Sequence, residues 1–259
     1  MKAPQNKLKH ALAAGQMQIG MWLNLASASA AELVGGAGYD WVLVDGEHAP
    51  FDPSRIQDQL RTLGQFDVSP IVRVPVGEEW VIKQVMDLGA QSLLVPMVDT
   101  GAHAQQMVAA TRYAPEGRRG MGAGAARAAR FGQVGDYLEN ANDEICLILQ
   151  AETRLAVENI DEIAGTEGVD CVFIGPADLS ADMGHRGDPG HPEVKEAIAH
   201  AVSRIRAAGK AAGFLHFDPS DSAYYKELGV TFLGVGSEAV LLRMALENNL
   251  NASRQALNL

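Results

Sequence analysis

The chain has few cysteines, few basic residues and no long apolar run. Its only two cysteines, Cys146 and Cys171, lie inside apolar stretches, which predicts buried reduced thiols and fits a reducing cytoplasm. Lysine and arginine number 21 against 32 aspartates and glutamates, a net charge of −11, which argues against nucleic acid or an anionic membrane as the main partner. We therefore expect no signal peptide, no membrane span and a cytoplasmic protein.

What the chain does contain is an alternation of strand-like and helix-like segments over 259 residues, 47% of them hydrophobic. The apolar runs that predict strands cover residues 18–23, 41–45, 70–74, 92–96, 145–149, 171–174, 211–215 and 232–235. Helical patterns follow at 27–34, 53–63, 78–88, 101–112, 153–164, 192–208, 220–228 and 237–249. Eight such units predict an α/β fold, a single-domain (β/α)8 TIM barrel over residues 1–259. No GxGxxG follows the first strand, which weighs against a dinucleotide-binding fold.

Two neighbouring predicted strands end in carboxylates. The run at 145–149 leads into Gln150 and Glu152, and the run at 171–174 leads into Asp178. Because parallel strands end at the same edge of a sheet, these oxygen donors should converge, and such donors suit a hard divalent cation. The alternative is that Glu152 caps the next helix and Asp178 lies in a solvated turn.

Charged residues also follow the second and third strands. Asp45 lies three residues before His48, where it could orient the imidazole and raise its basicity, making His48 a candidate base. Arg73 lies between two valines, and a buried arginine needs anionic company. It could face the carboxylate or developing enolate of a substrate, or form a structural ion pair with Glu152 or Asp45.

One connection, residues 113–143, is far longer than a normal loop. It contains the glycine- and arginine-rich stretch RRGMGAG at 118–124, followed by Arg127 and Arg130. Such a loop could bind an anion. The interpretation that we favour is an ordered loop that packs on a neighbouring subunit.

Four motifs in order carry a resemblance: VDGEHAP at 44–50, PIVRVP at 70–75, QAET at 150–153 and FIGPADLS at 173–180. They resemble the motifs of the metal-dependent (class II) pyruvate aldolases, the family of 4-hydroxy-2-oxoheptanedioate aldolase and 2-dehydro-3-deoxyglucarate aldolase. The likeness covers nearly the whole chain, including Arg119-Gly120 in the long loop. It implies a (β/α)8 barrel with a swapped C-terminal helix, a homohexamer, and a divalent Mg, Mn or Co ion.

The resemblance also implies roles for single residues. Glu152 and Asp178 resemble the metal ligands, His48 the base, and Arg73 the residue that steadies the enolate. The substrate contacts that it implies are Gln150, the backbone amide of Ala177, Asp178, Arg73 and, on the acceptor side, Leu215. Asp87, which the residues alone present as a solvated helix position, resembles an aspartate that reaches a neighbouring subunit's histidine. The stretch 215–217 differs between family members and should border the acceptor aldehyde.

The function that follows is reversible cleavage of a 4-hydroxy-2-oxo acid into pyruvate, or hydroxypyruvate, and an aldehyde. A lysine that could form a Schiff base is absent from the predicted strand ends, which fits metal-dependent chemistry. One rival is an acyl-CoA lyase of the citryl- or malyl-CoA type, which would need a surface for the nucleotide. The other is a non-catalytic binder of oxo acids.

Overall fold

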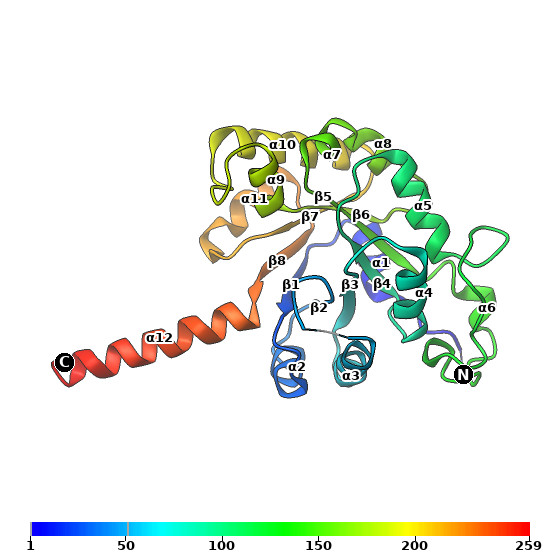
Figure 1. The fold of residues 1–259 in the computed structure, drawn as a ribbon, viewed down its shortest axis with the longest axis horizontal. Helices are drawn as coiled ribbons and strands as arrows, with labels where there is room; N and C mark the ends of the chain where they lie inside the picture. The colour runs from blue at the N-terminus through cyan, green and yellow to red at the C-terminus, as the bar shows by residue number, and fades with distance from the viewer. Residues whose placement is uncertain (1, 51) are drawn as a thin grey trace.

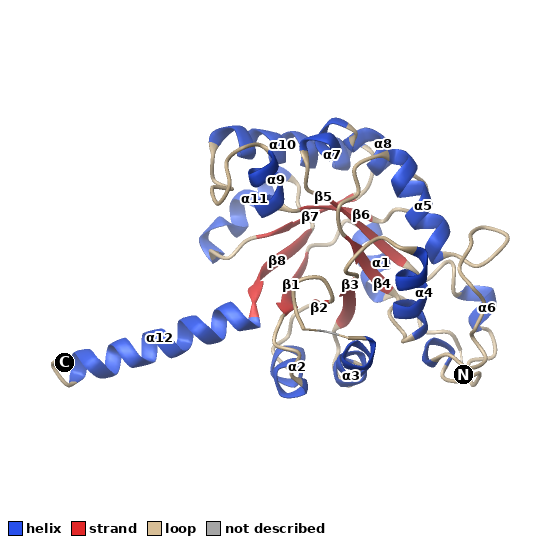
Figure 2. Cartoon of the chain, viewed as in Figure 1, coloured by secondary structure: helices blue, strands red, loops and turns tan. Residues whose placement is uncertain are grey.

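Eight parallel strands form the centre of the molecule (Figure 2). The structure is a computed structural model that describes residues 2–50 and 52–259. Consecutive strands pair in order, and β8 pairs with β1, so that the sheet closes into a barrel. The strands are β1 Gln18–Leu23, β2 Trp41–Asp45, β3 Ser69–Arg73, β4 Ser92–Val95, β5 Cys146–Ala151, β6 Cys171–Ile174, β7 Ala211–Leu215 and β8 Phe232–Ser237. The predicted (β/α)8 barrel is confirmed.

Helices surround the barrel, and most begin at a capping residue visible in the sequence. They are α1 Lys7–Ala13, α2 Ala28–Gly35, α3 Pro53–Leu63, α4 Glu79–Asp87, α5 Gly101–Thr111, α6 Tyr137–Asn140, α7 Arg154–Glu158, α8 Ile160–Gly165, α9 Pro176–Asp182, α10 Pro192–Ala207, α11 Ser222–Leu228 and α12 Glu238–Ala256, with 3-10 turns η1 Arg127–Ala129 and η2 Pro219–Asp221. Ser27 caps α2 by accepting a hydrogen bond from the Ala30 amide, and Asp52 caps α3 before Pro53.

The structure differs from the predicted helices in three places. The pattern at 153–164 is two helices, because Asn159 leaves helical geometry and its side chain donates to the Asp99 carbonyl. A short helix, α9, follows β6 where no helix was predicted. The last helix continues to Ala256, well past residue 249.

Strand alternation divides the apolar residues between two cores. Side chains that point outward pack against the helices. Those that point inward include Trp22, Trp41, Phe173 and Phe232, with Trp41 stacked on Phe232 at 4.2 Å. A methyl group at Gly213 would collide with Phe173 and Phe232, so glycine makes room there for the aromatic filling. Aromatic residues therefore fill the lower part of the barrel.

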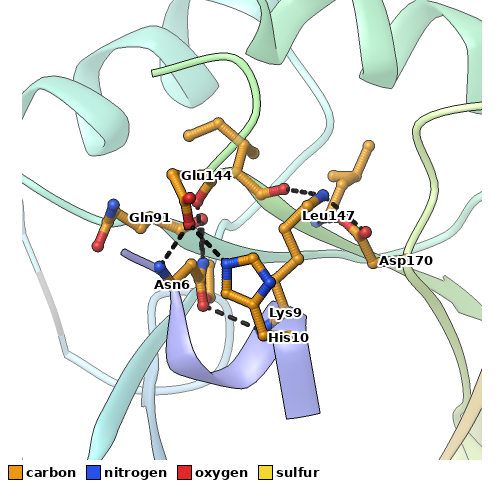
Figure 3. Close-up of polar contacts among 9 residues, drawn as sticks. Asn6, Lys9, His10, Gln91, Glu144, Leu147 and Asp170 are labelled. Carbon is orange, nitrogen blue, oxygen red and sulfur yellow. Dashed lines mark hydrogen bonds and ion pairs between the residues drawn. The ribbon is translucent and has the colours of Figure 1, made fainter. Parts of the chain in front are cut away.

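The N-terminal edge of the barrel is closed by α1 (Figure 3). The side-chain amide of Asn6 donates to Ser92 Oγ at 3.0 Å and to the backbone carbonyl of Glu144 at 3.1 Å. The ammonium of Lys9 binds Asp170 at 2.8 Å. Leu8 and Leu12 of the same helix are buried against the barrel interior. The helix α1 therefore closes the N-terminal edge of the barrel, whereas active sites of this fold lie at the C-terminal edge.

The long connection also lies at the N-terminal edge, since it runs from the end of α5 to the start of β5. It has a small core of its own, formed by Tyr113, Ala123, Ala129, Val134, Tyr137 and Ala141. Its arginines bind protein groups: Arg118 pairs with Glu79, Arg119 with Asp87, and Arg127 donates to the Leu88 carbonyl. These three contacts tie the long loop to α4 and to Leu88, the residue that follows it.

The C-terminal helix α12 projects away from the barrel (Figure 1). Its first residue, Glu238, is buried and accepts hydrogen bonds from the amides of Asn24 and Leu25. Every residue from Leu241 to Leu259 is exposed, including Leu241, Leu242, Met244, Leu246 and Leu250. None of the described helices combines the length and apolar character that crossing a membrane requires.

Candidate active site

A cavity of about 610 Å³ opens at the C-terminal edge of the strands. Seven of the predicted site residues line it: Asp45, His48, Arg73, Gln150, Ala177, Asp178 and Leu215. Asp45, Arg73 and Gln150 point to the same side of the sheet because side chains alternate between its two faces along each strand. Each lies two residues beyond an inward-pointing apolar residue, so it points inward at the top of the filled core. Glu152 lies two residues further than Gln150 and follows the same direction.

Asp45 and Arg73 form a buried, two-pronged ion pair. They are register partners on β2 and β3, and Arg73 donates from Nε at 2.9 Å and from Nη2 at 2.7 Å. Burial alone would raise the pKa of Asp45, but the hydrogen bonds and charge of Arg73 hold it below its ordinary value. The third guanidinium nitrogen, Nη1, lies 3.0 Å from Glu47 Oε2. Two alternatives were considered for Arg73, a structural ion pair and a position facing the substrate cavity. The structure shows that Arg73 forms the ion pair and also lines the cavity.

The predicted contact between Asp45 and the imidazole of His48 is replaced by backbone contacts. Asp45 Oδ1 accepts from the backbone amides of Glu47 at 3.1 Å and His48 at 3.3 Å, and Asn24 binds Oδ2 at 2.9 Å. With Arg73 also bound, the carboxylate has no room for the ring. The carboxylate beside the imidazole is Glu47, with Oε2 3.9 Å from His48 Nε2. The His48 side chain is 63% exposed and faces the cavity.

Glu152 is buried among oxygen-bearing groups. Its Oε1 accepts from the Met97 amide at 2.9 Å, and its Oε2 accepts from the Gln150 side chain. Burial raises the pKa of Glu152 to about 7, and the nearby charges of Asp178 and Glu47 act in the same direction. The expectation that Glu152 merely caps a helix does not hold, because Thr153 caps α7.

The donor set around Glu152 fits a divalent cation. The side-chain oxygen Oε1 of Gln150 is buried without a hydrogen-bond partner among the described residues, beside the Glu152 carboxylate. Asp178, in the first turn of α9, is exposed and lines the cavity. A Cβ at Gly175 would collide with Glu152 Oε2, so glycine leaves the carboxylate its space. Two carboxylates and an unpaired carbonyl oxygen are the ligands that Mg²⁺, Mn²⁺ and similar ions prefer.

A second group that could hold a metal ion lies outside this cavity. His185, His191 and Glu193 offer ligand atoms within 4.8 Å of one another. The two imidazoles stack at 3.5 Å, and His185 Nε2 lies 3.0 Å from Glu193 Oε2. Glu193 is in the first turn of α10, where the helix dipole favours an anion and disfavours a cation. We therefore place the candidate metal centre at Glu152 and Asp178.

Asp87 does not join the site of its own chain. It is the last residue of α4, which runs against the strands and ends at the N-terminal edge of the barrel. There it accepts from Arg119 Nη2 at 2.8 Å, with the arginine packed on the ring of Tyr113 at 4.4 Å. Arg119 is fully buried, and its Nε and Nη1 have no hydrogen-bond partner among the described residues. Within one chain Asp87 is an ion-pair partner of the long loop.

Sequence reasoning missed several residues that shape the cavity. Asn24, directly after β1, and Glu47, inside a quoted motif, could have been found from their places at strand ends. Lys195 in α10 and Tyr225 in α11 also line the cavity, and no local pattern marks them. Asn24 donates a hydrogen bond to Asp45, and Glu47 forms an ion pair with Arg73, so both residues help to hold the Asp45–Arg73 pair in place.

Comparison with known proteins agrees with this geometry. The profile of the HpcH/HpaI aldolase/citrate lyase family matches residues 18–245. The chain is 57% identical over 240 residues to a hydroxypyruvate/pyruvate aldolase of Deinococcus radiodurans, with 93% of this chain and 87% of that protein covered. It is 49% identical over 245 residues to a 2-keto-3-deoxy-L-rhamnonate aldolase of Klebsiella pneumoniae subsp. pneumoniae, with 95% and 92% covered.

A crystal structure from Burkholderia cenocepacia J2315, described as an HpcH/HpaI aldolase/citrate lyase family protein, superimposes with a TM-score of 0.94 at 39% identity. The match covers 96% of this chain and all of that one. The likeness thus extends over the strands, the cavity and the helices that carry the quoted motifs. The chain belongs to the HpcH/HpaI aldolase/citrate lyase family and is a carbon–carbon lyase of its aldolase class, as the four motifs predicted.

Proposed function

We propose that the chain cleaves 4-hydroxy-2-oxo acids reversibly into pyruvate, or hydroxypyruvate, and an aldehyde, with a divalent metal ion as cofactor. The observation that carries the proposal is the convergence of Arg73, His48 and Asp178 on one cavity, with the buried Glu152 close enough to Asp178 for the two charges to interact. The names of the relatives, which are pyruvate-type aldolases, support the same reaction class. The full-length similarity to such aldolases also favours this reaction over that of an acyl-CoA lyase.

Glu152 and Asp178 are the residues that would hold the metal, and Mg, Mn and Co all suit their oxygen donors. Bound there, a divalent cation would act as a Lewis acid toward a 2-oxo acid. Gln150 and the backbone amide of Ala177 line the same end of the cavity and would bind the oxo acid. Gly175 caps α9 without a side chain, so the first amides of that helix remain open to a ligand.

Arg73 contributes a fixed positive charge. As the bond between carbons 3 and 4 of the substrate breaks, its electrons move toward the oxo oxygen at carbon 2. A guanidinium held by Asp45 and Glu47 would stabilise that charge without having to reorient. Its role would be in both substrate binding and the transition state.

His48 is the proposed base. Its ring faces the cavity and can take the proton from the hydroxyl on carbon 4 while the aldehyde carbonyl forms. The proton then goes to carbon 3, which completes pyruvate. Asp45 positions His48 through the backbone amide, and Glu47 lies beside the imidazole, so both support the base without touching the reacting atoms.

Assembly belongs to the same proposal. The exposed apolar residues of α12 would be covered by exchange of this helix with a second copy, and a homohexamer built from such dimers would bring Asp87 of one subunit to another's site. We also propose one catalytic domain over residues 1–259 and a cytoplasmic location, which the two buried free cysteines support.

The test is exchange of the pyruvate methyl protons with deuterated water, followed by NMR without any aldehyde. Wild type should exchange, an excess of chelator should stop exchange, and Mg, Mn or Co should restore it. Glu152→Gln should abolish exchange, whereas Glu193→Gln, in the histidine cluster outside the cavity, should leave it intact. Exchange that persists in chelator, or borohydride trapping of pyruvate on a lysine, would contradict the proposal.

A further inference from the structure

The turn that follows β1 is tied to the first residue of α12. Glu238 Oε1 accepts hydrogen bonds from the backbone amides of Asn24 at 2.7 Å and Leu25 at 2.8 Å. Its Oε2 accepts from the amide of Asn24 at 2.9 Å and from that of Ala239 at 3.0 Å. One buried carboxylate thus accepts from three backbone amides, which belong to two segments that lie far apart in the sequence.

The same turn supports the ion pair at the inner end of the cavity. The side chain of Asn24 donates to Asp45 Oδ2 at 2.9 Å, and Arg73 Nη2 donates to the same oxygen at 2.7 Å. At the end of β1, the ring of Trp22 lies 5.9 Å from Arg73 Cζ. A shift of this strand end would therefore move two of the groups that contact the pair.

We infer that Glu238 is a positioning residue for the Asp45–Arg73 pair and acts on it through Asn24. The inference rests on the proposed aldolase function, in which Arg73 supplies a fixed positive charge. The bonds from its amide to Glu238 fix the backbone of Asn24, so its side chain reaches Asp45 from one direction. Glu238 itself is outside the cavity lining, so its effect on the reaction is indirect.

A carboxylate suits this position for two reasons. Every contact of Glu238 comes from a backbone N–H group, and a carboxylate is a side chain that only accepts. Glu238 also lies in the first turn of α12, where the helix dipole favours a negative charge. In Glu238→Gln, one oxygen becomes an NH₂ group that would face a donor whichever way the amide is turned. The turn would then shift, and Asn24 would lose its alignment with Asp45.

The position of the turn is also linked to the direction of α12, because Glu238 begins that helix. Figure 1 shows α12 leaving the barrel directly after β8. A helix seated in another direction would carry the carboxylate with it and release the amides of the turn. The geometry of the ion pair therefore depends on how α12 is seated, although no residue of Glu238–Ala256 lines the cavity.

The experiment is a double-mutant cycle with Glu238→Gln and Asn24→Ala, read as kcat/KM for metal-dependent exchange of the pyruvate methyl protons. Asn24→Ala keeps the backbone amides and removes only the bond to Asp45. Each single variant should lower kcat/KM by about three- to thirtyfold, since each loses hydrogen bonds to a charged group. The double variant should lie within about twofold of the more impaired single variant, because both changes break the same series of contacts. Magnesium affinity, measured by calorimetry, should stay unchanged in all of them, because Glu152 and Asp178 are untouched.

Glu144→Gln is the matched control. The side chain of Glu144 is only 15% exposed and accepts from the backbone amide of Asn6 at 2.6 Å, but it lies at the N-terminal edge of the barrel. Glu144→Gln should lower Tm and leave kcat/KM unchanged. Should Glu238→Gln fail to fold, Glu238→Asp, which keeps the charge on a shorter side chain, replaces it in the cycle.

The outcomes separate this inference from the aldolase proposal. Absence of exchange in wild-type protein would count against the aldolase function itself. With exchange present, fold-changes that multiply in the double variant would overturn the inference, because Glu238 would then not act through Asn24. Unchanged kcat/KM in the Glu238 variant, or an equal loss in Glu144→Gln, would also overturn it.

Discussion

Asp45→Asn tests whether the cavity depends on the buried ion pair. The substitution keeps the shape of the side chain but removes the charge that faces Arg73 Nε and Nη2. The side chains of Asp45 and Arg73 are 1% and 9% exposed, so water cannot replace the lost partner. The amide nitrogen of asparagine would also face a donor, either Arg73 or Asn24, and leave one hydrogen bond unmade.

The expected loss is large because the pair is buried. Breaking a buried ion pair by changing one partner costs about 3–5 kcal/mol, and the conserved shape of asparagine favours the lower end. At about 2–4 °C per kcal/mol for a domain of this size, Tm should fall by about 6–12 °C. The chain contains a matched exposed pair: Arg204 donates to Asp161 from the same two nitrogens at 2.7 and 2.6 Å, with the side chains 47% and 58% exposed. Asp161→Asn should leave Tm almost unchanged, because water replaces the lost partner of an exposed ion pair.

Thermal unfolding followed by circular dichroism, at one protein concentration, provides the measurement. A further check comes from pH. The pKa of Asp45 lies below 3.8 in the folded protein, so its stabilisation is complete above about pH 3.8 and is lost as the pH falls through the folded value. The difference in Tm between wild type and Asp45→Asn should therefore shrink in acid. Equal small changes for Asp45→Asn and Asp161→Asn would refute the reasoning.

Four further predictions follow from the site and the assembly. His48→Ala should still bind metal, seen as a thermal shift, but aldol cleavage should fall about 10²–10⁴-fold, and undiminished cleavage would remove His48 from the mechanism. Arg73→Ala should impair both KM for the oxo acid and kcat, whereas a change in only one of them would assign Arg73 to binding or to catalysis alone. Leu215→Ala should change the preference among aldehydes more than the KM for pyruvate, and equal losses for all aldehydes would make it merely structural. In sedimentation, wild type should be an oligomer. Leu242→Glu should dissociate it, and the control Asn249→Glu should not. A fully active wild-type monomer would contradict the role of α12.

The fold was predictable because each barrel strand is a short run buried on both sides, followed by a helical period. The misses have local causes. The helical spacing of apolar residues continues across Asn159, although the helix itself breaks there. Two helices were therefore predicted as one. In α9, Pro176 opens a helix of only seven residues within a motif whose glycine and proline also suit a turn. In α12 no glycine or proline follows Asn249, and the helix continues with every side chain exposed.

The site was predictable where it depends on strand ends and not where it depends on side-chain partners. Parallel strands end at the same edge of a sheet, and this rule alone predicted that Arg73 and Gln150 would share one cavity. Which carboxylate meets which cation depends on register and rotamers, which is why Asp45 was expected to hold the His48 ring and instead holds Arg73. Tyr225 reaches the cavity only because α11 folds back over β7, a tertiary event with no signature near residue 225.

The charges at the inner end of the cavity explain why a cation should be needed before substrate. The pKa of Glu47 is raised by burial and responds to Arg73, His48, Asp45 and Asp178, and that of Glu152 responds to Asp178 and Glu47, so these groups share one electrostatic environment. Asp45 and Glu47 contact Arg73 directly, and the charge of Asp178 acts on both Glu47 and Glu152. Arg73 is already neutralised by Asp45, so an anionic oxo acid entering the metal-free cavity would meet net negative charge. A divalent ion reverses that balance. Calorimetry should therefore detect pyruvate binding only after metal is added, and metal-free protein that binds pyruvate as tightly as the loaded protein would show that Arg73 alone suffices.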